Sequence, residues 1–157
     1  TSLGGARPVF TNAGTFVKPA EVDGVPLEGV TKFDAVFDND GAVDVRGGQL
    51  HFSGGFTQTA GETKLNGGSI SSSTALDIQG GTLTGFGTVS GGVSNAGQTN
   101  PGLPVGAITI DGDYDQSATG ALNVEIGGLI AGTDYDQLDV NGFVTLSTRQ
   151  EISVACF

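Results

Sequence analysis

The sequence predicts an all-β protein whose short parallel strands wind into a β-solenoid. Glycine supplies 28 of the 157 residues and interrupts almost every window that could form a helix. Short runs of alternating apolar and polar residues recur along the chain, and each is followed by a glycine-containing turn. Because glycine adopts positive φ angles without steric cost, such turns suit the corners of a coil.

The alternating runs predict strands with one buried face. Val43–Val45 and Leu76–Ile78 each place two aliphatic side chains on one side and an aspartate on the other. We therefore expect Val43, Val45, Leu76 and Ile78 in the core, and Asp44 and Asp77 facing solvent.

Three kinds of internal repeat favour a coil. Glycine pairs occur at 47–48, 54–55, 67–68 and 80–81, which predicts equivalent corners. A second repeat joins Phe10–Gly14, Phe37–Gly41 and Val93–Gly97, and a third joins Phe56–Ala60 with Tyr114–Ala118. With strands about 4.8 Å apart, seven or eight rungs, each one circuit of the coil, would form a rod roughly 35 Å long.

An antiparallel β-sandwich is the alternative fold. Two-residue hairpin turns favour Asn-Gly and Asp-Gly, and the sequence offers such pairs at 66–67, 111–112 and 141–142. One-faced alternation and self-similarity are the commoner pattern here, so we favour the solenoid.

Composition excludes several classes of partner. The chain has 6 basic and 17 acidic residues, a net charge of −11, and it lacks any basic cluster. A nucleic-acid binder needs a positive face, and an anionic membrane surface would repel this chain. The missing positive face excludes nucleic acid as a partner. Because no apolar run is long enough to span a bilayer, we also expect no membrane insertion.

The residue types needed for catalysis are scarce, so we predict that the protein is not an enzyme and has no catalytic residues. Glycoside hydrolysis needs a pair of placed carboxyl groups, and no Asp-Asp pair is present. The single histidine, His51, lies between Leu50 and Phe52 and is predicted to face solvent. No Gly-x-Ser-x-Gly elbow accompanies it. A polysaccharide lyase would need clustered basic residues, whereas these are scattered at Arg7, Lys18, Lys32, Arg46, Lys64 and Arg149.

Two acidic clusters are the candidates for cation binding. Asp111, Asp113 and Asp115 alternate and would line one face of a strand, and a second group contains Asp38, Asp40 and Asp44. Neither has the late bidentate glutamate of a calcium loop. A solvated acidic face and weak intermolecular cation bridging both remain open, and we predict no metal site and no cofactor.

Three further residues carry alternatives. Cys156 is either a small buried apolar residue or an intermolecular crosslink, because a single cysteine cannot form an internal disulfide. Tyr114 and Tyr135 each precede an aspartate and are predicted to mark equivalent corners. Stacking of either ring on a sugar is a second interpretation.

Three stretches, Asn95–Gly102, Ile108–Gln116 and Tyr135–Gly142, resemble passenger regions of autotransporter-like and β-strand-repeat surface proteins of bacteria. The resemblance covers residues 11–146 and implies a right-handed parallel β-helix in a secreted or cell-surface protein. After Leu146 the sequence departs from that pattern, because Ser147–Glu151 replaces the expected glycine turn.

These observations predict one solenoid domain, residues 1–157. Within it, residues 147–157 form a divergent C-terminal strand that caps the coil or pairs with a neighbouring subunit. We expect a non-enzymatic structural component of a bacterial cell-surface or extracellular assembly: a stalk, adhesive scaffold or fibre subunit. Self-association would proceed end to end by β-strand addition. A glycan-binding or polysaccharide-degrading module, with surface glycan as its partner, is the alternative function.

Overall fold

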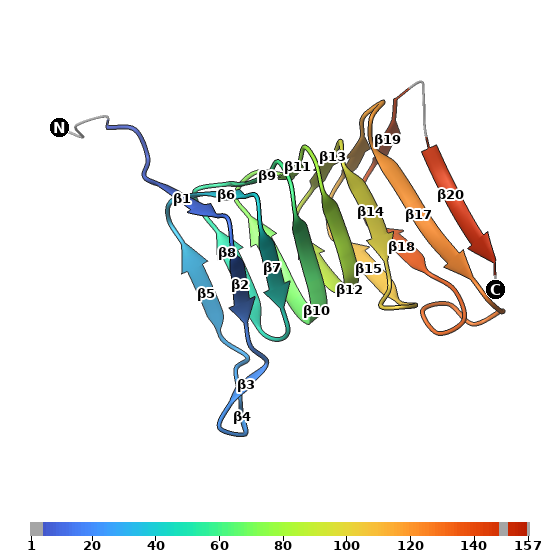
Figure 1. Ribbon diagram of the computed structural model, residues 1–157, viewed down its shortest axis with the longest axis horizontal. Coiled ribbons are helices and arrows are strands. Elements are labelled where there is room, and N and C mark those ends of the chain that lie inside the picture. The colour runs from blue at the N-terminus through green and yellow to red at the C-terminus, as the bar shows by residue number, and fades with distance from the viewer. Residues whose placement is uncertain (1–4, 148–150, 157) are drawn as a thin grey trace.

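The computed structural model describes residues 5–147 and 151–156 as an all-β molecule (Figure 1). One parallel sheet of seven strands forms what we call face 1. In spatial order its strands are β1 (Val9–Asn12), β6 (Val36–Asn39), β9 (Phe56–Gln58), β11 (Leu76–Ile78), β13 (Val93–Asn95), β16 (Tyr114–Gln116) and β19 (Val144–Leu146).

A second, branched sheet supplies two further faces. Face 2 contains β2 (Thr15–Lys18), β7 (Ala42–Val45), the first halves of β10 (Glu62–Ser72) and β12 (Thr82–Ser90), β14 (Gln98–Pro101), β17 (Ala121–Ile126) and β20 (Glu151–Cys156). Face 3 contains β5 (Val30–Phe33), β8 (Gln49–Phe52), the second halves of β10 and β12, β15 (Ala107–Ile110) and β18 (Gln137–Val140).

The chain visits faces 1, 2 and 3 in that order and returns to face 1 one strand further along. Every ladder in the two large sheets is parallel, which confirms the predicted all-β class and strand direction and makes the sandwich alternative wrong. The register sets the rung length at 17 residues between Leu76 and Val93, but at 30 between Tyr114 and Val144. Insertions between faces 2 and 3 lengthen the first and sixth rungs.

Inward side chains stack in columns that fill the coil. The face 1 column runs through Phe37, Phe56, Leu76, Val93 and Tyr114, none more than 2% exposed. Each fully buried side chain of this size contributes about 1.5–3 kcal/mol. The prediction that Val43, Val45, Leu76 and Ile78 are core residues is confirmed, because all four are fully buried.

The four glycine pairs do not occupy equivalent corners. Pairs 47–48 and 67–68 lie at the corner between faces 2 and 3, whereas 54–55 lies between faces 3 and 1, and 80–81 between faces 1 and 2. The prediction of equivalence was wrong because each rung has three corners and glycine occurs at corners of all three kinds, so the four pairs belong to different corners.

The expected hairpin turns are also corners. Asn66–Gly67 lies at the bend within β10, Asp111–Gly112 joins β15 to β16, and Asn141–Gly142 joins β18 to β19. An antiparallel hairpin does occur in the first-rung insertion, where β3 (Glu21–Val22) pairs with β4 (Val25–Pro26). At its tip Asp23 and Gly24 have φ angles of 52° and 75°, as a tight hairpin turn requires.

The second and third sequence repeats belong to one inward column of face 1. Register aligns Asn12, Asn39 and Gln58, and further along aligns Asn95 with Gln116; all are buried. The Asn12 Nδ2 donates to Asn39 Oδ1 (2.8 Å), and Asn39 Nδ2 donates to Gln58 Oε1 (3.1 Å). The amides also donate to backbone carbonyls of the next rung, such as Glu62 O and Thr82 O, so this amide ladder joins successive rungs through buried hydrogen bonds.

Candidate functional site

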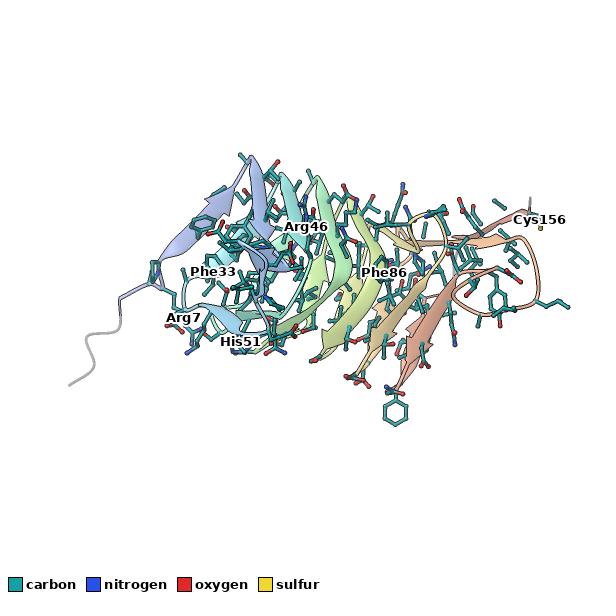
Figure 2. The ribbon with its side chains drawn as sticks, turned by 90° about the horizontal axis from the view of Figure 1, so that it is seen from below. Arg7, Phe33, Arg46, His51, Phe86 and Cys156 are labelled. Atoms are coloured by element: carbon teal, nitrogen blue, oxygen red, sulfur yellow. The ribbon has the colours of Figure 1, made fainter. Side chains whose placement is uncertain are left out.

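The two ends of the coil hold most of the exposed apolar surface. Among the described residues, the exposed large apolar side chains lie on or next to the first and last strands or on the insertions beside these strands, apart from Phe86 and Leu103. What we call the N-terminal end surface comprises Phe10, which points inward on β1, the outward-facing Val9, Val17 and Val30, and Val22 and Val25 of the β3–β4 hairpin. The C-terminal end surface comprises Ile126, Leu129, Ile130, Phe143, Val144, Leu146, Ile152 and Val154. Figure 2 places Arg7 and Phe33 toward one end and Cys156 at the other.

Both end surfaces are bounded by strands with one free edge within the described residues. At the N-terminal end, β1, β2 and β5 each pair on one side, with β6, β7 and β8. At the C-terminal end, β18, β19 and β20 pair on one side with β15, β16 and β17. A free edge presents unpaired N–H and C=O groups that can accept another strand.

A cavity of about 180 Å³ opens at the C-terminal end. It is lined by the inward side chains of the last strands, namely Tyr114, Gln116, Leu122, Leu138, Val140, Val144, Leu146 and Ile152. At its base, Tyr114 Oη accepts from Asn95 Nδ2 (3.0 Å) and lies 2.8 Å from Gln116 Oε1. Burial raises the pKa of the Tyr114 phenol, so it is a neutral hydrogen-bonding group of the core.

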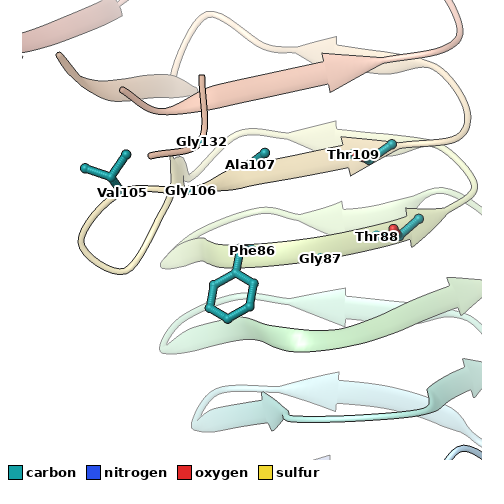
Figure 3. A pocket seen from close by; sticks show the side chains of 8 residues that line it. All are labelled: Phe86, Gly87, Thr88, Val105, Gly106, Ala107, Thr109 and Gly132. Carbon is teal, nitrogen blue, oxygen red and sulfur yellow. The ribbon is translucent and has the colours of Figure 1, made fainter. Parts of the chain in front are cut away.

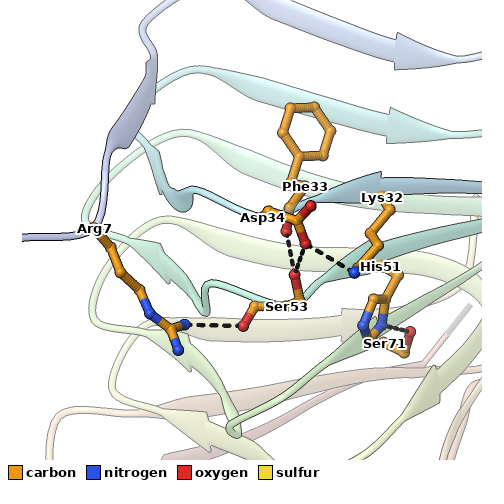
Figure 4. A network of polar contacts seen from close by, with 7 residues as sticks. All are labelled: Arg7, Lys32, Phe33, Asp34, His51, Ser53 and Ser71. Atoms are coloured by element: carbon orange, nitrogen blue, oxygen red, sulfur yellow. Dashed lines mark hydrogen bonds and ion pairs between the residues drawn. The ribbon is translucent and has the colours of Figure 1, made fainter. Parts of the chain in front are cut away.

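A polar network lies beside the N-terminal end surface (Figure 4). The Ser53 hydroxyl lies 2.5 Å from Asp34 Oδ1, Lys32 Nζ lies 2.9 Å from the same oxygen, and Arg7 Nη1 donates to Ser53 O (3.1 Å). The hydrogen bond from Ser53, followed by the contact with Lys32, lowers the pKa of the Asp34 carboxyl.

Replacing Ser53 by alanine should raise the pKa of Asp34 toward its ordinary value, because the main stabilising donor is lost. Because the pKa of Asp34 is lower in the folded state than in the unfolded state, its ionised carboxylate stabilises the fold at pH values above the unfolded-state pKa. This stabilisation is lost as the pH falls through the folded-state pKa. The Ser53→Ala variant should therefore lose part of this pH-dependent stabilisation. Carbon-13 NMR titration of the Asp34 carboxyl measures the change, with Ser94→Ala on face 1 as control. An unchanged Asp34 titration would contradict the assignment.

An open groove of about 500 Å³ runs beside Phe86 on face 3 (Figure 3). Glycine backbone, Val105 and Ala107 line it, together with the Thr88 and Thr109 side chains. The Phe86 ring is 41% exposed. A second hollow of about 260 Å³ lies near Asp136, whose carboxylate oxygens accept the backbone N–H groups of Gly106 (3.0 Å) and Glu125 (2.9 Å).

His51 is half-buried on face 3, and its Nδ1 lies 2.7 Å from Ser71 Oγ. A catalytic Ser-His-Asp arrangement needs a carboxylate that orients the imidazole. The nearby Asp34 is bound instead to Ser53 and Lys32. The contact between His51 and Ser71 therefore joins two neighbouring strands. That the protein is not an enzyme stays a prediction.

The acidic clusters do not form as the sequence predicted. Asp111 and Asp113 flank a corner, where they accept from Asn141 Nδ2 and the Phe143 N–H, both at 2.8 Å; Asp115 projects outward from β16. The expectation of one aspartate-lined strand face was wrong because Gly112 bends the backbone. Residues 5–147 and 152–156 contain no group of three or more His, Cys, Asp or Glu side chains placed to hold a metal ion.

The second acidic group is likewise divided. Asp38 lies in β6, and Asp40 accepts a hydrogen bond from the Thr59 hydroxyl at a corner. Asp44, in β7, accepts at Oδ2 from Arg46 Nε (2.7 Å). The three carboxylates therefore belong to separate local contacts.

The structure contradicts one of the two alternatives for Cys156 and the expected equivalence of two tyrosines. Cys156 is exposed, because it lies on the outermost strand of face 2, so it is not a buried apolar residue; crosslinking stays untested. Tyr114 and Tyr135 are not equivalent, because Tyr114 is a core residue of β16 whereas Tyr135 lies in the sixth-rung insertion.

The divergent segment 147–157 is placed in part. Glu151–Cys156 pairs with β17 as the last described strand of face 2, so this segment extends the coil by one strand. Residues 148–150 and Phe157 lie outside the described residues. The described part of the chain contains no helix with the length and apolar character of a membrane span.

Comparison of the chain with protein-family models, with curated proteins and with solved structures gives no match to any of the three.

Proposed function

We propose that the chain is a β-solenoid that serves as a non-enzymatic structural element and associates end to end. The concentration of exposed apolar side chains at the two end surfaces carries the proposal. Exposed apolar side chains beside free strand edges favour association with a matching surface. The right-handed coil and the setting in a bacterial extracellular or cell-surface assembly rest on the sequence resemblance.

The outward side of face 1 supports an axial contact over a lateral one. Outward positions of face 1 carry short polar and acidic side chains, in register from Thr11 through Asp38, Thr57, Asp77, Ser94 and Asp115 to Thr145. The net charge of −11 makes two chains lying side by side repel one another. Rods, stalks and fibres are the structures that such a surface distribution favours.

A glycan-binding module is the second candidate, and the Phe86 groove is the observation that favours it. The exposed ring and the two threonine side chains would offer a stacking surface with adjacent hydroxyls. A screen of polysaccharides for binding and for released reducing ends separates this function from the structural one.

Replacing Val144 by aspartate should weaken self-association at least tenfold, because an unpaired charge would be buried in the contact. Val144 is 54% exposed in the single chain, so the fold should tolerate the change. Phe86→Asp is the matched control, since Phe86 is an exposed apolar residue on the side of the coil. Light scattering over a concentration series, with electron microscopy of the particles, measures the effect.

The unmodified chain should give extended particles whose mass rises with concentration. A single-chain mass at every concentration, or disruption by Phe86→Asp and not by Val144→Asp, would count against end-to-end association.

A further inference from the structure

A polar hollow of about 260 Å³ opens on the outer side of face 2, where β12, β14 and β17 lie side by side (Figure 1). It is the hollow next to Asp136, and we call it the Asp136 hollow. Its lining residues all differ from those of the Phe86 groove and from those of the two end surfaces. Binding in this hollow is therefore independent of end-to-end association.

Thr84 lines the hollow with a hydroxyl that has no partner. Leu83 is fully buried in the core, so the next residue of β12, Thr84, points outward. Thr84 is nevertheless only 7% exposed. Within the described part of the chain, its hydroxyl makes no hydrogen bond. Most buried polar side chains have a hydrogen-bond partner, so a ligand that supplies one here gains binding energy.

The neighbouring strands add three further polar groups. Asn100 lies beside Thr84 in register, and Asn123 Nδ2 donates to Asn100 Oδ1 (2.6 Å). This bond orients both amides, and it leaves Asn100 Nδ2 and Asn123 Oδ1 without a partner among the described residues. Glu125 follows on the same side of β17, and its carboxylate is also without a partner there. The hollow thus presents a hydroxyl, an amide N–H, an amide oxygen and a carboxylate.

The walls of the hollow are held by hydrogen bonds within the protein. Asp136, 7% exposed, accepts from the Glu125 N–H (2.9 Å) and the Gly106 N–H (3.0 Å), which ties β17 to the loop after β14. At the start of that loop, Gly102 N donates to Gly85 O of β12 (2.6 Å). A site whose walls are fixed before binding loses less conformational entropy when the ligand enters.

The loop after β14 also supplies an apolar part of the lining. Pro101, Leu103 and Pro104 contribute this surface. Leu103 is 37% exposed and lies away from the two end surfaces. Ligand sites commonly combine apolar walls with a few placed polar groups, and the C–H groups of a sugar ring pack well against such walls.

From this mixture of groups we propose that the Asp136 hollow binds a neutral sugar ring, either as a free sugar or as one unit of a glycan. Each sugar hydroxyl both donates and accepts hydrogen bonds, so one ring can satisfy all four unpartnered side chains. The volume lies below the roughly 300–1,000 Å³ of sites for drug-sized ligands, which suits a single ring.

The same groups disfavour charged ligands. A divalent cation such as calcium takes about six to eight oxygen ligands, whereas the lining offers one unpartnered carboxylate and the N–H groups of Asn100. An acidic sugar would meet the Glu125 carboxylate and the net charge of −11. The hollow therefore selects a neutral ring.

Binding of defined sugars tests the proposal. The probes are the methyl glycosides of glucose, galactose and mannose, neutral oligosaccharides of the same sugars, and methyl glucuronide. Ligand-observed NMR detects binding, and calorimetry gives the affinity. We expect at least one neutral probe to bind, and methyl glucuronide to bind about tenfold more weakly. Binding of a methyl glycoside identifies a free ring as sufficient, whereas binding of oligosaccharides alone identifies a glycan unit.

Two variants locate the bound sugar. Thr84→Val removes the unpartnered hydroxyl and keeps the side-chain shape, so it should leave the fold intact and weaken binding about fivefold. Glu125→Gln removes the charge and should weaken binding about tenfold. Thr82→Val is the matched control, because Thr82 is the neighbouring outward residue of β12 and lies outside the hollow. Circular dichroism checks that all three variants are folded.

Three results would overturn the inference: no binding of any neutral probe, tighter binding of methyl glucuronide than of the neutral glycosides, or equal affinity of Thr84→Val and Thr82→Val. If Phe86→Ala abolishes binding and Thr84→Val does not, the sugar occupies the Phe86 groove instead. Light scattering of Thr84→Val should match that of the unmodified chain, so sugar binding and end-to-end association are tested separately.

Discussion

Replacing Asn39 by alanine should lower the free energy of unfolding by about 3 kcal/mol, because several buried polar groups lose their partners. Asn39 is 1% exposed. Its Oδ1 accepts from Asn12 Nδ2 (2.8 Å), and its Nδ2 donates to Gln58 Oε1 (3.1 Å) and lies near the carbonyls of Gly41 (3.3 Å) and Glu62 (3.4 Å). The truncation also leaves a cavity in the amide ladder.

Asn141→Ala is the matched control for this substitution. Asn141 also lies at a corner and donates from Nδ2 to a neighbouring rung, at 2.8 Å from Asp111 Oδ1, but this contact is exposed to solvent. Water replaces the lost partner, so the loss should stay within about 0.5 kcal/mol. Urea unfolding at neutral pH compares the two variants. Equal losses would show that the amide ladder does not stabilise the coil through buried hydrogen bonds.

The amide ladder also shows where reasoning from sequence stopped. The repeats at Phe10–Gly14, Phe37–Gly41 and Val93–Gly97 are detectable from residue order alone, and they are equivalent in the structure. An Asn-x-Gly pattern does not predict that the asparagine side chain points inward, since asparagine close to glycine is also typical of turns exposed to solvent. The signal that could have revealed it is Gln58 and Gln116, which hold the same position in rungs with longer corners.

Strand direction was predictable, whereas rung boundaries were not. One-faced alternation at Val43–Val45 and Leu76–Ile78 depends only on local pattern, and burial follows it. A fixed period fails because corners accept insertions of different length, as the 17-residue and 30-residue rungs show. Tyr114 was misplaced for a related reason, because its phenol is satisfied inside the coil by Asn95, a partner distant in sequence.

The sequence alone predicts that the two end surfaces contain apolar residues, but not how these residues are arranged. Apolar residues alternate with polar ones near residues 9–17 and 144–154, and this pattern predicts strands there. The three-dimensional register is needed to show that β18, β19 and β20 share one end, and that the cavity between them is apolar. Residues 107–110 pair with 137–140 across an insertion, a connection that no local pattern encodes.

Replacing Gly85 by alanine should lower the free energy of unfolding by about 3 kcal/mol, which for a chain of this size corresponds to a fall of roughly 10 °C in Tm. Two effects combine. Gly85 has a φ angle of 100°, which an L side chain adopts only with strain, and an added Cβ would overlap the backbone oxygen of Leu65 in the neighbouring strand. The neighbouring rung can relieve the overlap only by moving away, which weakens the parallel ladder between β10 and β12.

Gly24→Ala separates these two effects. Gly24 has a φ angle of 75°, but no atom lies within 4 Å of the site of an added Cβ at the hairpin tip. Strain alone remains there, so we expect a loss of about 1 kcal/mol and a fall of roughly 2–4 °C in Tm, followed by circular dichroism. If both variants melt at the same temperature, close stacking of successive rungs does not explain the need for glycine at position 85. A larger fall in Tm for Gly85→Ala than for Gly24→Ala would assign the difference to contact between successive rungs. Both glycines have positive φ angles, but only Gly85 lies against the backbone of a neighbouring strand.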